Sequence, residues 1–152
     1  MDCSRLEYIK NVNDDEAWAY EDYLIGSYFR LNFKQGEGVD SHTFNLPKGS
    51  LIILSQRPPG KERYLTHVVE LVNDGSEDKP QWETGIWGIF RWVKVHWIAD
   101  FNNPSRIPLD KNEMRAEWGC YNTKAKLLSS ENLMKQWGSI DKLRAHLGEV
   151  FN

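Results

Sequence analysis

The middle of the chain, residues 49–98, is patterned as three β-strands separated by two loops. Residues 49–56 contain a short apolar run that opens at a Pro-Lys-Gly turn signal and closes at the Arg-Pro-Pro-Gly stretch of residues 57–60. Proline has no main-chain N–H to donate to a neighbouring strand, so the strand must end there. Consecutive apolar positions are typical of a strand that is buried on both faces, and we predict a central strand at residues 49–56.

The next two segments alternate with the two-residue period of a strand. In residues 64–73, one face holds Leu65, His67, Val69 and Leu71. In residues 86–98, one face holds Trp87, Ile89, Arg91, Val93, Val95 and Trp97, and the other holds Phe90, Trp92, Lys94 and His96. This last segment is longer than a usual strand, and Gly85 and Gly88 allow a bulge or bend. We expect it to curve across two parts of a barrel-like sheet.

The N-terminal flank has the pattern of a helix. Ala17, Tyr20 and Leu24 are spaced three and four residues apart and would form one apolar stripe. An acidic stretch with capping residues precedes them at 13–16, and Gly26 ends the pattern. We predict a helix here.

The C-terminal flank predicts two short helices. Ser130 is placed to cap a helix that reaches Trp137, where Gly138 would stop it. Ser139 is placed to cap a second helix over residues 140–147. Two segments that carry Pro, Asn and Gly are predicted connections: residues 34–48 and 100–122.

These patterns predict an α+β fold, with a small mixed or antiparallel β-barrel flanked by N-terminal and C-terminal helices. A chain of 152 residues fits one domain, residues 1–152, with the composition of an ordinary globular protein. The longest apolar run, residues 51–54, is far shorter than the roughly 20 residues that cross a bilayer. The first residues also lack the apolar core of a secretory signal, so we expect a cytoplasmic protein without a membrane partner.

The formal net charge is −3, and it is unevenly distributed. Acidic residues exceed basic ones in residues 1–48, whereas residues 49–128 carry a slight basic excess. Proteins that bind long nucleic acids without sequence preference usually show a strong basic excess. Any nucleic-acid partner must therefore be recognised through a local pocket or patch in the middle of the chain.

The sequence contains no well-marked catalytic or metal-binding motif. His67 and Glu70 resemble a proton-transfer pair, but residues three apart on a strand point to opposite faces, so we predict a structural histidine. The four histidines and the two cysteines, Cys3 and Cys120, lack metal-site spacings. We predict no metal, no cofactor, no catalytic residues and reduced cysteines, and an enzymatic role stays an open alternative.

Aromatic residues are abundant, with 7 Trp, 6 Tyr and 6 Phe. On the long strand, Trp87 and Trp97 share one face and Trp92 takes the other, so one core cannot bury all three. Either these side chains pack a small barrel, or one lines a cleft that suits a planar base or a methylated cation. Likewise, the cations of the loop at residues 57–63 fit either a solvated hairpin or a guide for phosphate.

The order of these three strands resembles the PUA-like superfamily, especially the EVE domain and its YTH and ASCH relatives. The segments that carry the likeness are residues 49–54, 65–72 and 87–98, within roughly 50 residues or one-third of the chain. The resemblance implies a pseudobarrel of five or six strands with helices at its edges and a pocket that accepts a flipped, modified base in an aromatic cage. EVE-type members are associated with modified nucleic acid and, in bacteria, with defence against foreign DNA. EVE-like proteins often carry a Trp where this chain has Leu54 and Ser55.

The resulting hypothesis is a non-catalytic module that binds a modified nucleobase or nucleotide of DNA or RNA in an aromatic pocket. Trp82 or Trp92 would stack on the base, and Asn11, Ser55 and Gln56 would bind its polar edge. Tyr8 and Asn11 would fill the position of the first strand. The predicted phosphate ligands are Arg57, Lys61 and Arg91.

Two alternatives stay open. A protein-interaction or regulatory domain would present an exposed tryptophan cluster on a flat surface instead of a concave pocket. A small hydrolase or transferase for a nucleotide-like substrate would need Glu70 or Glu83 to meet a histidine in one cleft.

Overall fold

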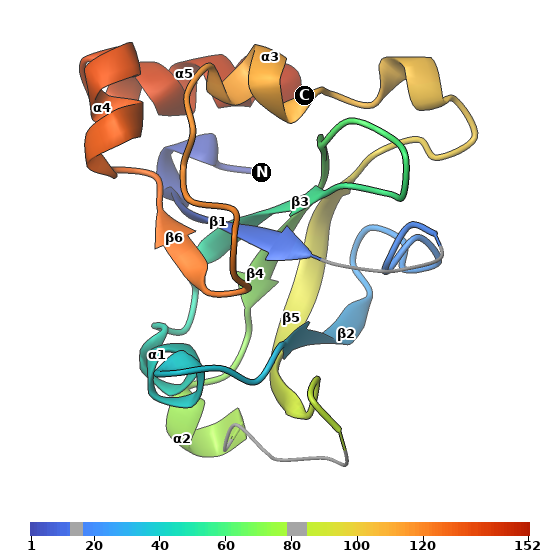
Figure 1. The fold of residues 1–152 in the computed structure, drawn as a ribbon, viewed down its shortest axis with the longest axis vertical. Helices are drawn as coiled ribbons and strands as arrows, with labels where there is room; N and C mark the ends of the chain where they lie inside the picture. The colour runs from blue at the N-terminus through green and yellow to red at the C-terminus, as the bar shows by residue number, and fades with distance from the viewer. Residues whose placement is uncertain (13–16, 79–84) are drawn as a thin grey trace.

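The structure, a computed structural model, describes residues 1–12, 17–78 and 85–152. These residues form a mixed six-stranded sheet in the order β2-β5-β4-β3-β1-β6. The strands are β1 (Leu6–Val12), β2 (Tyr28–Phe33), β3 (Leu51–Gln56), β4 (Tyr64–Leu71), β5 (Ile89–Ile98) and β6 (Ala125–Leu127). β1 runs parallel to β3, and the other neighbouring strands are antiparallel. The sheet curls into a half-barrel, which agrees with the predicted α+β, barrel-like fold (Figure 1).

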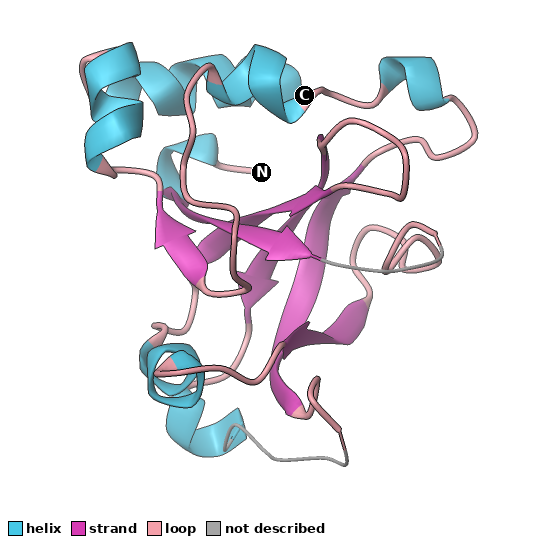
Figure 2. Cartoon of the chain, viewed as in Figure 1, coloured by secondary structure: helices cyan, strands magenta, loops and turns pink. Residues whose placement is uncertain are grey.

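Helices lie at two ends of this sheet (Figure 2). The α-helices are α1 (Val39–Asn45), α2 (Gly75–Asp78), α3 (Asp110–Met114), α4 (Glu131–Trp137) and α5 (Ile140–Val150), with 3-10 turns η1 (Cys3–Arg5) and η2 (Pro104–Arg106). α3, α4 and α5 gather at one end, and α1 and α2 at the other. Within the described ranges, no helix has the length and apolar character that a membrane crossing requires.

β3 is the central strand that its apolar run predicts. It lies between β1 and β4, and all six of its residues are buried. Ile52 and Leu54 point into one hydrophobic cluster, and Leu51 and Ile53 into another. Each such side chain contributes about 1.5–3 kcal/mol when it leaves water, so this strand connects and stabilises both layers of the molecule.

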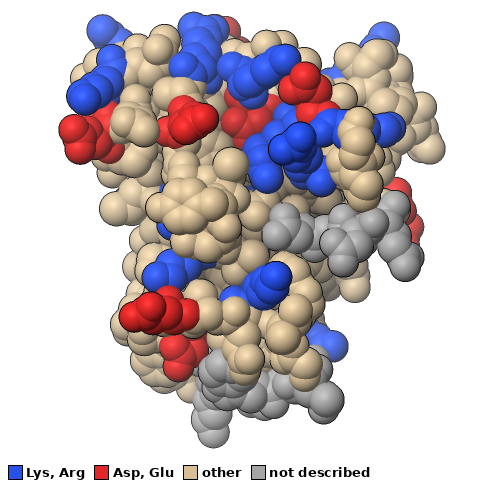
Figure 3. Space-filling view, viewed as in Figure 1, with Lys and Arg blue, Asp and Glu red and all other residues tan. Residues whose placement is uncertain are grey.

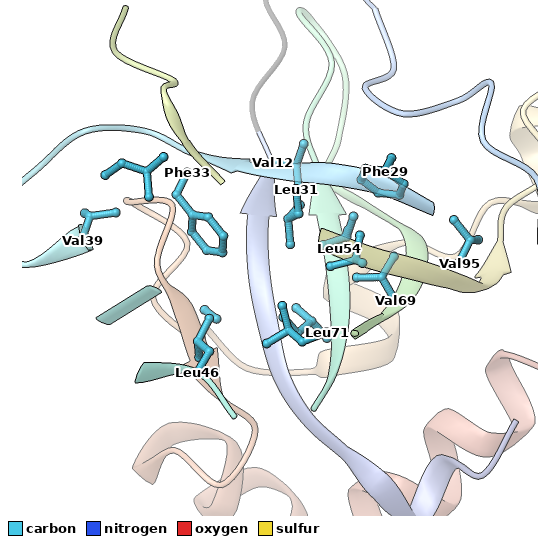
Figure 4. Close-up of a cluster of buried hydrophobic side chains, with 14 residues drawn as sticks. Val12, Phe29, Leu31, Phe33, Val39, Leu46, Leu54, Val69, Leu71 and Val95 are labelled. Carbon is cyan, nitrogen blue, oxygen red and sulfur yellow. The ribbon is translucent and has the colours of Figure 1, made fainter. Parts of the chain in front are cut away.

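The two clusters fill the inside and the outside of the curled sheet. Inside, apolar side chains from β1 to β5 and from α1 point toward one another (Figure 4). Outside, β1, β3 and β4 pack against the C-terminal helices through Leu133, Leu143 and Leu147. The helical end of the molecule is therefore fixed to the sheet by burial of an apolar face.

A β-bulge interrupts the predicted alternation of β4. Leu54 pairs with His67 and Ser55 pairs with Leu65, which leaves Thr66 as the extra residue. Leu65 consequently packs outside the sheet with Val68, not on the face of His67. The prediction that Leu65 shares a face with His67 is wrong for this reason.

β5 has the predicted faces only from Ile89 to Val95. After a register shift, Trp97 packs with the outer cluster, so the prediction that it shares the face of Ile89 is wrong. Ile89, Arg91, Val93 and Val95 are buried on one side, and Trp92 is exposed on the other. The strand begins after Gly85 and Gly88, and the register shift occurs near its far end, opposite Val68 and Val69. The chain turns at these glycines, and the strand predicted from residue 86 begins only at Ile89.

The predicted N-terminal helix is wrong. Residues 17–27 form turns, and Tyr20 has a φ of +60°, in the left-handed region that an α-helix excludes. Leu24 is 72% exposed and joins no apolar stripe. Residues 13–16, the predicted cap, lie outside the described residues.

The C-terminal helices are confirmed, although Ser130 precedes α4 without a side-chain capping hydrogen bond. α4 ends at Gly138, whose φ of +85° suits glycine, and α5 begins at Ser139, whose Oγ accepts the Lys142 N–H at 3.2 Å. The predicted connections 34–48 and 100–122 are not wholly irregular, because they contain α1 and α3.

Candidate functional site

A cleft of about 810 Å³ opens beside the loop that joins β3 to β4. The described residues that line it are Arg57, Gly60, Lys61, Glu62, Arg63 and Tyr64. The chain turns here because Pro58 and Pro59 end β3 and Gly60 adopts a φ of +72°. Figure 3 shows Lys and Arg side chains gathered on this face around the loop and α3.

Arg63 connects the cleft to the sheet beneath it. Its Nη1 donates to Asn11 Oδ1 at 2.6 Å and to the main-chain oxygen of Ser55 at 3.3 Å. Asn11 and Ser55 face each other as register partners near the ends of the parallel strands β1 and β3. The guanidinium is therefore held at the floor of the cleft, where two strands end side by side.

A buried carboxyl group supports this floor. Asp110 Oδ2 accepts the Ser55 hydroxyl at 2.6 Å and the Trp118 indole N–H at 3.0 Å, and the Asp110 N–H donates to the Arg63 carbonyl at 2.9 Å. Burial raises the pKa of Asp110, and the hydrogen bonds from Ser55 and Trp118 partly oppose this shift. The hydroxyl group of Ser55, a predicted ligand-binding residue, thus already donates to Asp110.

Gln56 orders the segment that follows β1 instead of facing the cleft. Its Oε1 accepts the Ala19 N–H at 2.8 Å, and its Nε2 donates to the Ala19 carbonyl at 3.1 Å and to Thr66 Oγ1 at 2.7 Å. Both amide hydrogens and the oxygen are in use. Gln56 therefore positions Trp18, the neighbour of Ala19, and is not free to bind the edge of a base.

An aromatic cluster, defined as Trp18, Tyr64 and Phe101, lies next to the cleft. The ring of Trp18 is 5.5 Å from that of Tyr64, nearly edge-on, and 5.2 Å from that of Phe101. All three side chains are half-buried, and Tyr64 lines the cleft itself. Aromatic surface therefore adjoins the cations of the loop.

His67 lies behind this cluster as a neutral, structural residue. It is fully buried, with Nε2 3.0 Å from the Tyr20 carbonyl and Nδ1 2.9 Å from Thr66 Oγ1. Burial lowers the pKa of His67 to about 4. Glu70 contacts His96 instead, at 2.9 Å, so the prediction that His67 and Glu70 do not cooperate is confirmed.

Arg91 does not have the exposed position that a phosphate ligand, its predicted role, requires. It is fully buried and donates to the carbonyl oxygens of Thr43 at 2.8 Å, Leu46 at 2.9 Å and Asn73. These bonds join β5 to α1 and to the end of β4. A phosphate contact would need an accessible guanidinium, so Arg91 is a structural residue here.

Other predicted ligands lie apart from the cleft. Tyr8 lines a different hollow, of about 360 Å³, with Pro47 and Arg144. Trp92 is 38% exposed and packs edge-on against Phe90, but it does not line the cleft. Trp82 and Glu83 lie outside the described residues.

The structure thus brings Asn11, Ser55, Gln56, Arg57 and Lys61 together and separates them from Tyr8, Trp92 and Arg91. Sequence reasoning counted Arg63 among the loop cations without assigning it to the site, and it missed Tyr64, Asp110 and the aromatic cluster. The cations of the loop were visible in the sequence, but the inward turn of Arg63 depends on Asn11, 52 positions away.

Metal chemistry has no evident site in the described part of the chain. No group of three or more His, Cys, Asp or Glu side chains there is arranged to hold a metal ion. Cys3 and Cys120 are free thiols, as predicted.

The cleft combines cations at its rim, half-buried aromatic rings on one side and satisfied polar groups beneath. The chain matches no model of a known protein family, no curated protein and no solved structure.

Proposed function

We propose that this chain is a non-catalytic binding module that recognises a modified nucleobase or nucleotide in the cleft beside the β3–β4 loop. The observation that carries the proposal is that Tyr64 and the cations Arg57 and Lys61 line one cleft. A nucleotide joins a planar base to a phosphate through one sugar, so its site needs aromatic surface and positive charge close together.

The aromatic cluster supplies the surface for a base. Stacking on an aromatic side chain contributes about 1–3 kcal/mol per base and tolerates any base, because each has a π-face. A methyl group on the base would add apolar area against Trp18 or Tyr64. The stacking role proposed for Trp82 or Trp92 passes to these two residues, which adjoin the cleft.

The loop supplies the contacts for phosphate. Arg57 and Lys61 are exposed, and the single carboxylate of the described lining, Glu62, lies 3.1 Å from Lys111. The cleft therefore carries a local positive charge on a chain whose net charge is −3. Such a patch favours an anionic ligand over a limited region only.

The fold is compatible with the PUA-like resemblance and supports this proposal. The three segments that carry the likeness form the adjacent strands β3, β4 and β5 of a curled sheet with helices at its edges. Under the proposal, the chain is a PUA-like, EVE-like domain that acts in nucleic-acid processing or defence.

A hydrolase or transferase is less well supported. Glu70 and His96 do meet at 2.9 Å, but neither lines the described part of the cleft. Glu70 and His96 therefore do not line the same hollow as the cations of the β3–β4 loop.

The test is a calorimetric titration with single-stranded DNA and RNA pentanucleotides whose central base is N6-methyladenine, 5-methylcytosine or the plain base. We expect micromolar binding and a preference for one methylated base. Equal affinity for all probes, with none tighter than millimolar, contradicts the proposal.

Two variants and a matched control locate the site. Tyr64→Ala and Arg57→Ala should each weaken binding by about tenfold, while circular dichroism stays unchanged. Lys48→Ala removes an exposed cation before the start of β3, the opposite end of the strand from Arg57, and should leave affinity unchanged.

A further inference from the structure

A second hollow adjoins the cleft at Arg63, which lines both. This hollow has a volume of about 320 Å³, and its described lining consists of Arg63, Asp110, Lys111, Arg115, Ala116, Glu117, Trp118 and Cys120. We infer that the two hollows form one groove for two adjacent nucleotides, in which Lys111 and Arg115 bind a second phosphate. This inference rests on the proposed function.

Arg63 is suited to lie between two phosphates. A guanidinium has five N–H donors, and all hydrogen bonds of the Arg63 side chain to the described residues come from Nη1. Nε and Nη2 make no such bond within the described chain. Arg63 lines both hollows, so these donors are placed at their junction.

The described lining of the second hollow has three cations and one exposed carboxylate, Glu117, so its charge favours an anion. Asp110 already accepts Ser55 and Trp118, so its carboxyl group is engaged beneath the surface. Lys111 pairs with Glu62 at 3.1 Å, but both side chains are more than half exposed, at 63% and 55%. Exposed pairs of this kind contribute little, so a phosphate can replace Glu62 as the partner of Lys111.

Arg115 is held in an unusual conformation at the end of α3. Its φ is +60°, in the left-handed region that non-glycine residues seldom adopt. Its guanidinium lies 4.7 Å from the centre of the Trp137 ring, and its Nε donates to the Asn112 carbonyl at 3.3 Å. These contacts fix the cation at the edge of the second hollow.

The positive part of the groove ends after this hollow. The next hollow, of about 430 Å³, shares Glu117, Trp118 and Cys120 and adds Glu131. Its described lining contains carboxylates but no Lys or Arg. A phosphate backbone is favoured across two hollows and disfavoured in the third, which sets the length at two nucleotides.

The experiment compares N6-methyl-AMP with the 5′-phosphorylated dinucleotide that carries N6-methyladenine first, and repeats both with 5-methylcytosine. We expect the dinucleotide to bind about tenfold more tightly. Its logarithmic affinity should fall more steeply with the logarithm of salt concentration, by about 0.7 in slope for the added phosphate.

Variants assign this gain to the second hollow. Lys111→Ala combined with Arg115→Ala should remove both the tenfold gain and the added salt slope. The gain is the ratio of dinucleotide to mononucleotide affinity in the same variant, because loss of Lys111 also frees Glu62 in the first cleft. Because Arg115 contacts Trp137, the single variant Lys111→Glu serves as a second test on an exposed side chain and should reduce the gain in the same direction. Lys48→Ala is the control.

The outcomes separate the two proposals. Equal affinity and equal salt slope for the two ligands overturn the second phosphate site and leave the proposed function standing. A gain that survives Lys111→Glu and the double variant also overturns it. Absence of binding by any probe overturns both.

Discussion

The side-chain amide of Gln56 pairs with both main-chain groups of Ala19, accepting the N–H at 2.8 Å and donating to the carbonyl at 3.1 Å. A neighbouring β-strand would form the same pair of hydrogen bonds with the main chain of Ala19. Because Gln56 is the last residue of β3, this pair places Trp18 beside the cleft. An amide that sequence reasoning assigns to ligand binding thus orders the chain beside the cleft.

Replacing Gln56 with leucine should therefore destabilise the protein and release Trp18. The substitution leaves Ala19 and Thr66 without their partner, which costs about 2–4 kcal/mol. Urea unfolding measures the loss, and tryptophan emission should shift as Trp18 becomes more exposed. Gln136→Leu, on the exposed side of α4, is the matched control and should change neither.

Lys10 makes stability depend on pH in the alkaline range. It is fully buried, its Nζ lies 4.5 Å from the Phe33 ring centre, and it donates to the Asn11 carbonyl at 3.1 Å. Burial lowers the pKa of Lys10 from 10.5 to about 7. Between these two values the unfolded chain binds more protons than the folded chain, so stability rises as pH increases from 7 toward 10.5.

Lys10→Met should remove this dependence. At pH values below 7 the variant should be more stable than the natural chain by on the order of 3 kcal/mol, because no buried charge has to be formed. Urea unfolding across the pH range measures the difference. Lys48→Met, at an exposed position, should show no such change, and equal pH slopes for Lys10→Met and the natural chain would refute the prediction.

His67 should be a neutral imidazole with its proton on Nε2. The Tyr20 carbonyl can only accept, so Nε2 must donate, and Nδ1 then accepts from the Thr66 hydroxyl. Burial lowers the pKa of His67 from 6.5 to about 4, so the unfolded chain binds more protons in this interval and stability falls as pH decreases through it. Nitrogen NMR shifts at pH 5.5 report the tautomer, and a charged ring there would contradict this structure.

Arg91 and Arg57 should respond in opposite ways to removal of their charge. Arg91→Met leaves buried carbonyls without a donor and should cost about 3–5 kcal/mol of stability, with little effect on ligand affinity in the folded fraction. Arg57→Met, on the exposed loop, should keep stability and lose affinity for the pentanucleotide probes. Thermal unfolding and calorimetry on both variants check this crossed pattern, which a phosphate role for Arg91 would reverse.

Local periodicity was sufficient for several elements. The apolar run of β3, the alternation of β5 as far as Val95 and the helices α4 and α5 are encoded by neighbouring residues, and each is present. The N-terminal helix failed because Tyr20 forms tertiary contacts instead. Its ring stacks on Phe29 at 4.3 Å and its hydroxyl accepts the Asn32 N–H at 3.0 Å, which override a weak helical stripe.

Short elements and the bulge escaped prediction for a related reason. β6 and α3 contain too few residues to show a period, and their positions depend on the strands and helices that they contact. The extra residue at Thr66 also depends on the pairing of β4 with β3. A register shift of this kind is a property of the pairing of two strands, and the sequence of neither strand alone predicts it.

By itself the sequence determined that β3, β4 and β5 are strands, which face of β5 is buried from Ile89 to Val95, and that a cationic loop follows the central strand. Only the tertiary structure decided that Arg63 turns inward and that Arg91 is sealed among carbonyls, and that Trp18 rather than Trp92 adjoins the cleft. The reason is that alternation and capping act between near neighbours, whereas a site forms where strands distant in the chain end together. The parallel pairing of β1 with β3 sets Asn11 beside Ser55, and no local pattern encodes that contact.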